Sequence, residues 1–313
     1  MKVICQNQYL NLPPCAATIG FFDGVHRGHR YLIEQLQAKA SEAGLPTTVI
    51  TFSQHPRQVV DANWQPKLLS CLDEKIELLA QTGIEQLVIL PFDRQMAALS
   101  ARTFMEQILH DQLNVRLLMT GYDNRFGHNR EEGFDDYVRY GQELGIKVCL
   151  GLPLIVGNIK VSSSAIRQLL ADANMDGVHQ CLGRYYSLKG YVVEGHQIGR
   201  QLGFPTANIE PKEPYKLIPA PGVYGIRIRI NQSEMWKNAM MNIGNRPTFD
   251  GHHQTLEAYI FDYEGDLYGS EIVVNFIFRH RSEQRFESPL ALINQLSADA
   301  KLIEQKLLIE NHL

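Results

Sequence analysis

Short apolar runs alternate with longer amphipathic segments through the first half of the chain. The apolar runs predict buried strands at residues 16–22, 47–52, 87–91, 115–120 and 147–150. The segments between them carry apolar residues at helical spacing and predict helices at 31–40, 72–81, 101–113 and 134–144. Because strands and helices alternate, we predict an α/β domain with a parallel, Rossmann-like sheet and helices on both faces.

The pattern changes after a short polar connector at residues 171–183. Strand-like runs then follow one another without helices between them, at 191–194, 225–230, 239–243, 256–261 and 272–278. Such a series predicts a compact antiparallel β-barrel. Residues 289–308 predict one amphipathic C-terminal helix. We therefore predict two domains, 1–175 and 183–313.

Length and composition fit two ordinary globular domains. The chain has 313 residues, 44% of them hydrophobic, and a net charge of −4. That charge does not favour binding to nucleic acid, because proteins that bind it usually carry a basic patch. No stretch of about 18 apolar residues and no signal peptide is evident, so we expect no membrane partner and a cytoplasmic location. The five cysteines are scattered without a CxxC pair and are interpreted as reduced thiols.

A glycine-rich stretch at residues 20–29, GFFDGVHRGH, links the first predicted strand to the first predicted helix. This stretch is called the signature turn. Backbone N–H groups at a helix N-terminus favour a phosphate, and His26 and His29 can face the same anion. Such a site suits nucleotidyl transfer, in which imidazoles stabilise charge on phosphate oxygens as pyrophosphate leaves. Alternatively, the two histidines are a metal pair or a chance surface motif, although no third ligand has the spacing of a zinc site.

Two further polar loops follow predicted strands at their carboxyl ends, where ligands of parallel sheets collect. These loops are His55-Pro56-Arg57 and residues 121–127. Later in the chain, Ser162, Ser163 and Ser164 predict the N-cap and first turn of a helix, where their hydroxyls and Arg167 would converge on a triphosphate. Alternatively, one serine merely caps the helix and Arg167 is a solvated charge.

A second glycine motif lies past the middle of the chain, where Gly195, Gly199 and Gly203 surround Arg200. Glycines let backbone amides approach phosphates that a Cβ atom would block. Thr206 and Asn208 follow, and their side-chain oxygens suit a Mg²⁺ ion that bridges the phosphates of ATP. The motif is neither a Walker A loop nor a Rossmann fingerprint.

Three stretches carry a resemblance to a known family. Residues 20–29 resemble the nucleotidyltransferase signature of bacterial bifunctional riboflavin kinase/FAD synthetases, residues 161–167 resemble their second adenylyltransferase motif, and residues 190–208 resemble their flavokinase motif. The resemblance spans essentially the whole chain. It implies that the first domain binds ATP through Gly20, Phe21, Asp23, Gly24, His26, Gly28, His29, Ser163, Ser164 and Arg167, with His26 and His29 taking part in catalysis.

The resemblance also assigns a flavin side to the first domain. Residues 121–127 resemble the family's flavin-side loop, in which Asp123 would orient the substrate, and His55 is a second candidate. The chain departs from the family at Asn124, where an aromatic residue is usual, and at Phe134, where Asp is common. Considered without the family, residues 121–127 are simply a turn and His55 is a loop residue before a proline.

In the second domain, the resemblance implies that Gly195, Gly199, Arg200, Gly203, Thr206 and Asn208 bind the phosphates of ATP, with Thr206 and Asn208 as metal ligands. Glu257 precedes an Asp-Leu-Tyr-Gly turn, as the family's catalytic base does, and Arg281 matches an arginine near the flavin. Ser282 replaces the more usual Asp. Without the resemblance, a strand glutamate such as Glu257 more often faces water.

The resemblance therefore implies a bifunctional enzyme with ATP, riboflavin, FMN and FAD as its ligands. Such an enzyme would phosphorylate riboflavin to FMN with MgATP, and its first domain would adenylylate FMN to FAD with release of pyrophosphate. Two alternatives remain open. One is a monofunctional riboflavin kinase with a decayed first site, and the other is a flavin-binding regulator without turnover.

Overall fold

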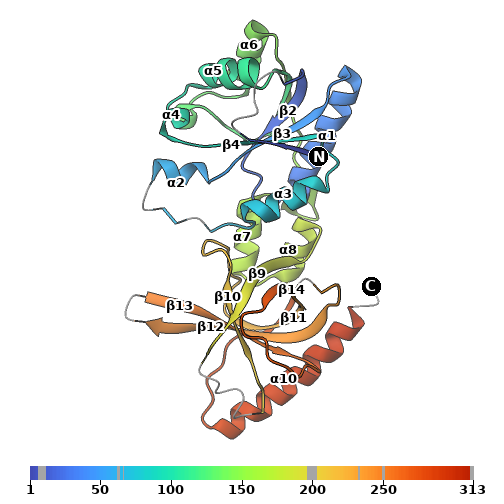
Figure 1. The fold of residues 1–313 in the computed structure, drawn as a ribbon, viewed down its shortest axis with the longest axis vertical. Helices are drawn as coiled ribbons and strands as arrows, with labels where there is room; N and C mark the ends of the chain where they lie inside the picture. The colour runs from blue at the N-terminus through green and yellow to red at the C-terminus, as the bar shows by residue number, and fades with distance from the viewer. Residues whose placement is uncertain are drawn as a thin grey trace. The chain divides into compact units, whose positions relative to one another are not determined.

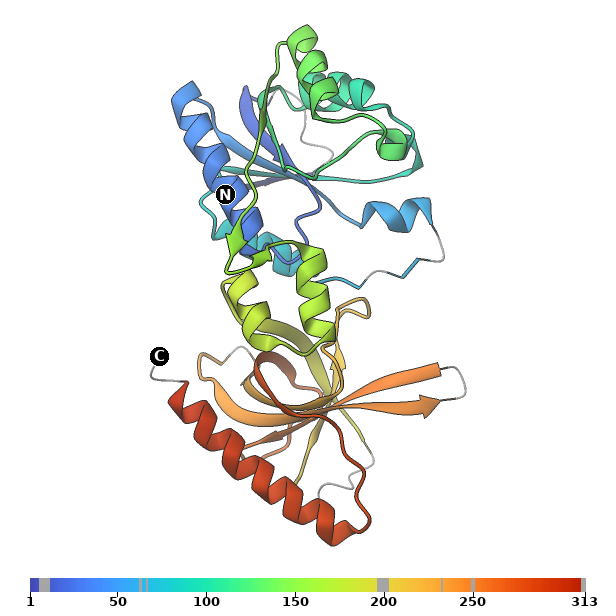
Figure 2. The same cartoon turned by 180° about the vertical axis from the view of Figure 1, so that it is seen from behind.

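The computed structural model describes residues 1–5, 12–61, 64–65, 67–195, 203–231, 233–248 and 251–310. The chain divides into two compact units, Met1–Ser163 and Ser164–Leu313. Each unit has a hydrophobic core of its own. Figure 1 and Figure 2 show the elements of both units from opposite sides.

The first unit is built on a six-stranded sheet in which all neighbouring strands are parallel. The order is β1-β4-β3-β2-β5-β6. The strands are β1 (Lys2–Ile4), β2 (Cys15–Ile19), β3 (Thr47–Phe52), β4 (Gln86–Leu90), β5 (Val115–Thr120) and β6 (Lys147–Leu150). The prediction of a parallel, Rossmann-like α/β domain is confirmed, and β1 is an edge strand that the pattern did not predict.

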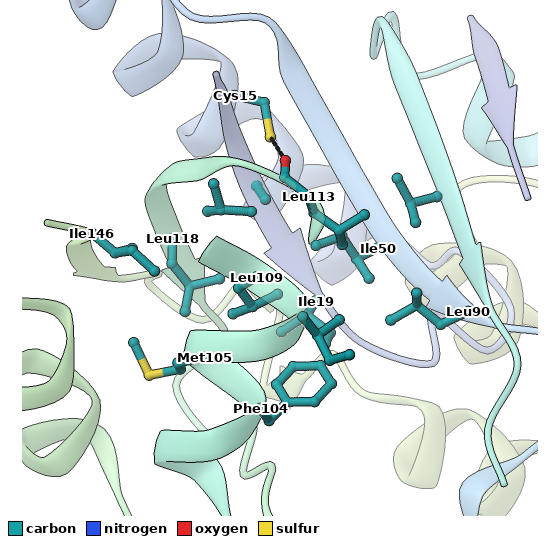
Figure 3. Close-up of a cluster of buried hydrophobic side chains, with 14 of the residues drawn as sticks. Cys15, Ile19, Ile50, Leu90, Phe104, Met105, Leu109, Leu113, Leu118 and Ile146 are labelled. Carbon is teal, nitrogen blue, oxygen red and sulfur yellow. Dashed lines mark hydrogen bonds between the residues drawn. The ribbon is translucent and has the colours of Figure 1, made fainter. Parts of the chain in front are cut away.

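Helices cover both faces of this sheet because consecutive strand residues project to opposite sides. Val49 packs with Ile33 of α1 (Arg27–Ala43) and Leu79 of α3 (Leu72–Ala80). The next residue, Ile50, packs on the other face with Phe104 and Leu109 (Figure 3). Burying each such aliphatic side chain contributes roughly 1.5–3 kcal/mol. The face that contains Ile50 is covered by α5 (Ala101–Phe104), a π-helix η2 (Met105–Gln112) and α6 (Phe134–Leu144).

The predicted helix at 101–113 is therefore two elements. Only the first turn, α5, is α-helical, and η2 continues with i→i+5 hydrogen bonds such as that from Leu113 N to Ile108 O. The buried residues Met105, Ile108 and Leu109 still face the sheet. Short elements complete the unit: α2 (Pro56–Val60), α4 (Arg94–Ala97), η3 (His128–Arg130), β7 (Ile155–Val156) and β8 (Ile159–Lys160).

The second unit begins with two helices, and the first is the one predicted after the serine motif. The second lies at residues 175–182, where the sequence predicted a polar connector, and that prediction was wrong. Helix α7 (Ser163–Ala171) starts at the junction of the units and α8 (Met175–Leu182) follows. Asn174 caps α8 and Gly183 ends it in the left-handed conformation, with φ 70°. Helix α8 packs on the barrel through residues at helical spacing that were overlooked among its polar neighbours: Met175, Val178, Cys181 and Leu182.

A closed six-stranded barrel forms the body of the second unit, as predicted. Every pair of neighbouring strands is antiparallel. The strands are β9 (Tyr186–Val193), β10 (Ala207–Pro211), β11 (Gly222–Ile230), β12 (Lys237–Thr248), β13 (Gly251–Ile260) and β14 (Glu271–Arg281), and they close in the order β10-β13-β12-β11-β14-β9. The predicted C-terminal helix is α10 (Pro289–Ile309), whose Ile303 and Leu307 pack on Val223, Met240 and Phe278.

Within the described ranges, each helix is too short or too polar to cross a membrane.

Candidate functional sites

The signature turn leaves the end of β2 in an unusual backbone conformation. Phe22, Gly24 and Val25 all have positive φ, at 54°, 80° and 37°. Such angles are costly for residues with a side chain and persist only where the surroundings hold them. Asp23, only 4% exposed, provides that hold, because its carboxylate accepts hydrogen bonds from the backbone N–H groups of Leu69 (2.9 Å) and Ser70 (3.0 Å). Gly24 N also donates to Ser70 Oγ at 2.8 Å.

The two histidines of the signature turn stack on each other at the start of α1. Their ring centroids lie 3.6 Å apart with an interplanar angle of 14°, and the ring of Phe22 lies 5.0 Å from that of His29. His26 is the N-cap, and its Nδ1 accepts a hydrogen bond from His29 N at 3.1 Å. In the neutral form of His26, the proton is therefore on Nε2.

His29 has an unused polar atom in a buried setting. Its Nδ1 is buried and lacks a hydrogen-bond partner among the described residues. Burial lowers the pKa of His29 well below its usual 6.5, and the nearby His26 and Lys75 lower it further. His29 is therefore neutral at physiological pH, and its buried Nδ1 is a polar atom that the described part of the fold leaves without a partner.

The predicted serine motif begins directly against the signature turn. A Cβ atom on Gly28 would lie 3.0 Å from the carbonyl oxygen of Val161, a tight contact that glycine avoids. Ser163 Oγ donates to Asp23 O at 3.0 Å. Ser163 thus joins the signature turn, whereas Ser164 is exposed and Arg167 half-buried on the part of α7 that belongs to the second unit.

Lys75 of α3 is the residue of this region that sequence reasoning missed. Its ammonium group donates to Phe21 O at 3.0 Å, and the side chain is only 2% exposed. A signal for it was present, because Lys75 occupies an apolar position in the stripe that Leu72, Ile76 and Leu79 form on the predicted helix.

The loop after β5 is tied to the end of β2. Asn124 Nδ2 donates to Ile19 O at 2.5 Å, so the residue that departs from the family's aromatic position has a hydrogen-bonding role in this chain. Phe126 stacks on Tyr137 at 4.1 Å, and the Tyr137 hydroxyl accepts a hydrogen bond from Phe126 N at 3.0 Å. These contacts hold the loop while leaving Asp123 exposed.

His55 lies after β3 and caps the short helix α2. Its Nδ1 accepts from Arg57 N at 3.1 Å, and the Gln58 side chain accepts from His55 N. The ring packs edge-on against Phe21, with centroids 4.6 Å apart, and also against Trp64 at 4.5 Å. His55 therefore contacts the signature turn. Phe134, the other departure from the family, is the first residue of α6 and is half-buried.

The candidate residues of the barrel form a row across three strands. Asn208 of β10 is paired with Glu257 of β13, which is paired with Asn242 of β12. Paired residues of neighbouring strands project to the same side of a sheet, so these three side chains share one face; they are called the barrel row. Sequence reasoning missed Asn242. Its polar side chain interrupts the apolar run 239–243, which was the available signal.

Close packing around the barrel row explains one glycine of the flavokinase motif. A Cβ atom on Gly195 would overlap the carboxamide of Asn208, so glycine lets the chain after β9 pass directly over Asn208. Thr206 lies two residues before Asn208, just ahead of β10, and both are half-buried. Gly203 has φ 83° and is exposed. Gly199 and Arg200 lie outside the described residues.

Arg281 at the end of β14 is engaged in an internal ion pair. Its Nε and Nη2 donate to Oδ2 of the fully buried Asp299 of α10 at 2.9 and 2.7 Å. Burial by itself favours protonated Asp299, but hydrogen bonds from Arg281 and Gln295 and the nearby His280 outweigh it and hold the pKa of Asp299 below its usual value. The ion pair fastens α10 to the barrel, and a contact between Arg281 and flavin stays a prediction.

Comparisons with known proteins agree on both halves of the chain. A sequence family described as FAD synthetase matches residues 9–165, and one described as riboflavin kinase matches residues 182–307. The bifunctional riboflavin kinase/FMN adenylyltransferase of Escherichia coli strain K12 is 38% identical over 302 residues, 96% of each chain. Its counterpart from Pseudomonas fluorescens is 36% identical and covers 91% of this chain and 90% of its own.

A solved structure also matches at full length. A Streptococcus pneumoniae protein described as a macrolide-efflux protein has a TM-score of 0.86 and 29% identity, over 97% of this chain and 99% of that one. Together with the two sequence families, this likeness extends over both units. The chain belongs to the family of bifunctional riboflavin kinase/FMN adenylyltransferases.

Proposed function

We propose that this enzyme makes FAD from riboflavin in two ATP-dependent steps, with the barrel carrying out phosphorylation and the first unit adenylylation. The chain is a riboflavin kinase and an FMN adenylyltransferase. The assignment of sites rests on one observation: in each unit, a motif suited to phosphate binding is held by contacts with the surrounding fold. In the first unit these contacts include the stacked histidines of the signature turn, and in the second they include the barrel row beside Gly195.

In the first unit, an oxygen of the FMN phosphate attacks the α-phosphorus of ATP. The new P–O bond forms as the bond to the β-phosphate oxygen breaks, and pyrophosphate leaves with the electron pair. The N–H groups at the start of α1 and the imidazole of His29 stabilise the charge that gathers on the phosphate oxygens. His29 is suited to this role because it is neutral and holds a buried Nδ1 that a ligand can satisfy.

The other predicted residues of this site fall into two groups. Asp23, Gly24, Gly28 and Ser163 hold the turn in shape through the contacts already described. Asp123, exposed on its loop, and His55, packed on Phe21, follow the carboxyl ends of β5 and β3, and we assign both to the flavin side. Ser164 and Arg167 follow on α7 as ligands of the ATP phosphates.

In the barrel, Glu257 accepts the proton of the ribityl hydroxyl as that oxygen attacks the γ-phosphorus of ATP, and ADP leaves. Glu257 is half-buried on the strand next to Asn208. Thr206 and Asn208 would hold Mg²⁺, because a hydroxyl and a carboxamide oxygen are hard ligands. When bound, the ion neutralises phosphate charge. Asn242 completes the barrel row as a further ligand of substrate oxygens.

The assignment is tested by supplying riboflavin or FMN with ATP and Mg²⁺ and separating riboflavin, FMN and FAD by chromatography. His29→Ala should cost FAD formation on the order of 100-fold while FMN formation continues. Glu257→Gln should lower the kcat of FMN formation about 10²–10⁴-fold with riboflavin still bound, and supplied FMN should still become FAD.

The same assay separates the alternatives. Wild-type protein that stops at FMN would support a monofunctional kinase, and riboflavin binding without ATP consumption would support a regulator. Equal loss of both reactions in a folded His29→Ala variant would contradict the division of the two sites.

A further inference from the structure

Lys75 places a positive charge inside the first unit. Its ammonium group donates to Phe21 O at 3.0 Å, Thr51 Oγ1 at 3.2 Å and Phe52 O at 3.2 Å. It also lies 4.0 Å from the centroid of the Phe21 ring. Its hydrogen bonds therefore connect α3 with the signature turn and with the end of β3, at the carboxyl ends of the two neighbouring strands β2 and β3.

This charge is poorly compensated by the groups it contacts. The three hydrogen-bond acceptors are neutral oxygens. Asp23 is the nearby acid, but its carboxylate is engaged with the N–H groups of Leu69 and Ser70. Desolvation lowers the pKa of Lys75 from 10.5 to about 8, although Asp23 and Cys71 raise it. A methionine in this apolar stripe would fill similar volume without a buried charge, so the demands of packing do not account for a lysine here.

Lys75 instead contacts the signature turn, the segment of the first unit that we propose binds ATP. Through Phe21 O it holds the first peptide units of the signature turn, whose later residues have strained backbone angles. Its field also reaches His29 and helps to keep that imidazole neutral. An anion bound at the start of α1 would compensate the charge that the protein leaves unbalanced.

We propose that Lys75 is a positioning residue of the adenylyltransferase site, whose buried ammonium group holds the signature turn and supplies a fixed positive charge beneath the phosphates of ATP. The inference rests on the proposed function of the signature turn. It assigns Lys75 no contact with substrate. Its effect is on the affinity for ATP and on the pH range in which the site works.

The first test is the pH profile of FAD formation from FMN, measured as kcat/KM for ATP between pH 7 and 9.5. This quantity reports ionisations of the free enzyme. In the wild-type enzyme it should fall as the pH rises through about 8, when Lys75 loses its proton. In Lys75→Met it should be lower by about tenfold at pH 7, less than the loss for a donor that touches the transition state, and should no longer fall with pH. The change should lie mainly in the KM for ATP.

The other ionisable groups that act on Lys75 or feel its charge are Asp23, Cys71 and His29, and His29 stacks in turn on His26. Of these, the thiol is the one whose class ordinarily titrates between pH 8 and 9. Cys71→Ser is therefore the matched control, and it should keep the wild-type profile. FMN formation from riboflavin in the same preparations is a second control and should be unchanged in all variants. Lys75→Arg, which stays charged throughout, should abolish the alkaline fall and regain ATP affinity relative to Lys75→Met.

Two results would overturn the proposal. One is a wild-type kcat/KM for ATP that does not change from pH 7 to 9.5. This result does not depend on whether any variant folds. The other is an unchanged activity and profile in Lys75→Met while His29→Ala still loses FAD formation, which would leave the site in place without a role for Lys75. If neither His29→Ala nor Lys75→Met alters FAD formation, the assignment of the signature turn itself is wrong.

Discussion

Raising the pH from 7 to 9.5 should stabilise the first unit of the wild-type protein relative to Lys75→Met. In the unfolded chain, the pKa of Lys75 returns to about 10.5, whereas burial holds it at about 8 in the folded chain. Between these values the unfolded state binds the extra proton, so the free energy of unfolding increases with pH. Each tenfold change in proton affinity is worth about 1.36 kcal/mol, which gives about 2 kcal/mol by pH 9.5 and about 3 kcal/mol above pH 10.5.

The two tryptophans allow this effect to be measured on one unit of the full chain. Trp64 belongs to the first unit and Trp236 to the second. In a Trp236→Phe background, urea unfolding followed by fluorescence reports the first unit alone. Taking the difference between Lys75 and Lys75→Met at each pH cancels the titration of groups that both proteins share. A difference in the free energy of unfolding that stays constant from pH 7 to 9.5 would refute the reasoning, because it would mean that folding does not lower the pKa of Lys75.

Three further predictions concern single contacts. Asn208→Ala should lower riboflavin phosphorylation and raise the Mg²⁺ concentration needed for it, because a ligand oxygen is lost; assays at limiting Mg²⁺ with unchanged FMN adenylylation would bear this out. Asn124→Ala removes the hydrogen bond to Ile19 O and should raise the KM for FMN roughly fivefold, the equivalent of about 1 kcal/mol; an unchanged KM would show that the loop keeps its place without it. Asp299→Ala leaves Arg281 without its buried partner and should destabilise the second unit by about 3–5 kcal/mol in urea unfolding followed by Trp236 fluorescence; a shift below 1 kcal/mol would contradict the role of this pair.

Local periodicity by itself determined most of the longer elements of the first unit. Strands β3, β5 and β6 and helix α6 have the bounds that the alternation of apolar and polar residues predicted. These patterns are readable because the central strands β3 and β5 are buried on both faces and the helices on one face, so burial is reflected directly in the order of residues. The phosphate-binding motifs are also recognisable in the sequence, because a helix N-terminus and its glycines are contiguous in the chain.

Periodicity failed where polar residues interrupted it. The pattern predicts a connector in place of helix α8 because Asp176, Gly177, His179 and Gln180 separate its buried residues, and only packing against the barrel reveals the buried stripe. The division into domains 1–175 and 183–313 likewise stays a prediction, while the compact units meet between Ser163 and Ser164.

Tertiary structure alone decided which distant residues meet. Glu257 and Asn208 are 49 positions apart and become neighbours only through the register of β10 and β13, which depends on how the whole barrel closes. Lys75 reaches Phe21 across 54 positions, and Arg281 reaches Asp299 on the final helix. The sequence contains each of these side chains but no local pattern that pairs them. The properties of a charged side chain depend on its burial and on its partners, and both arise only when separate segments of the chain fold against one another.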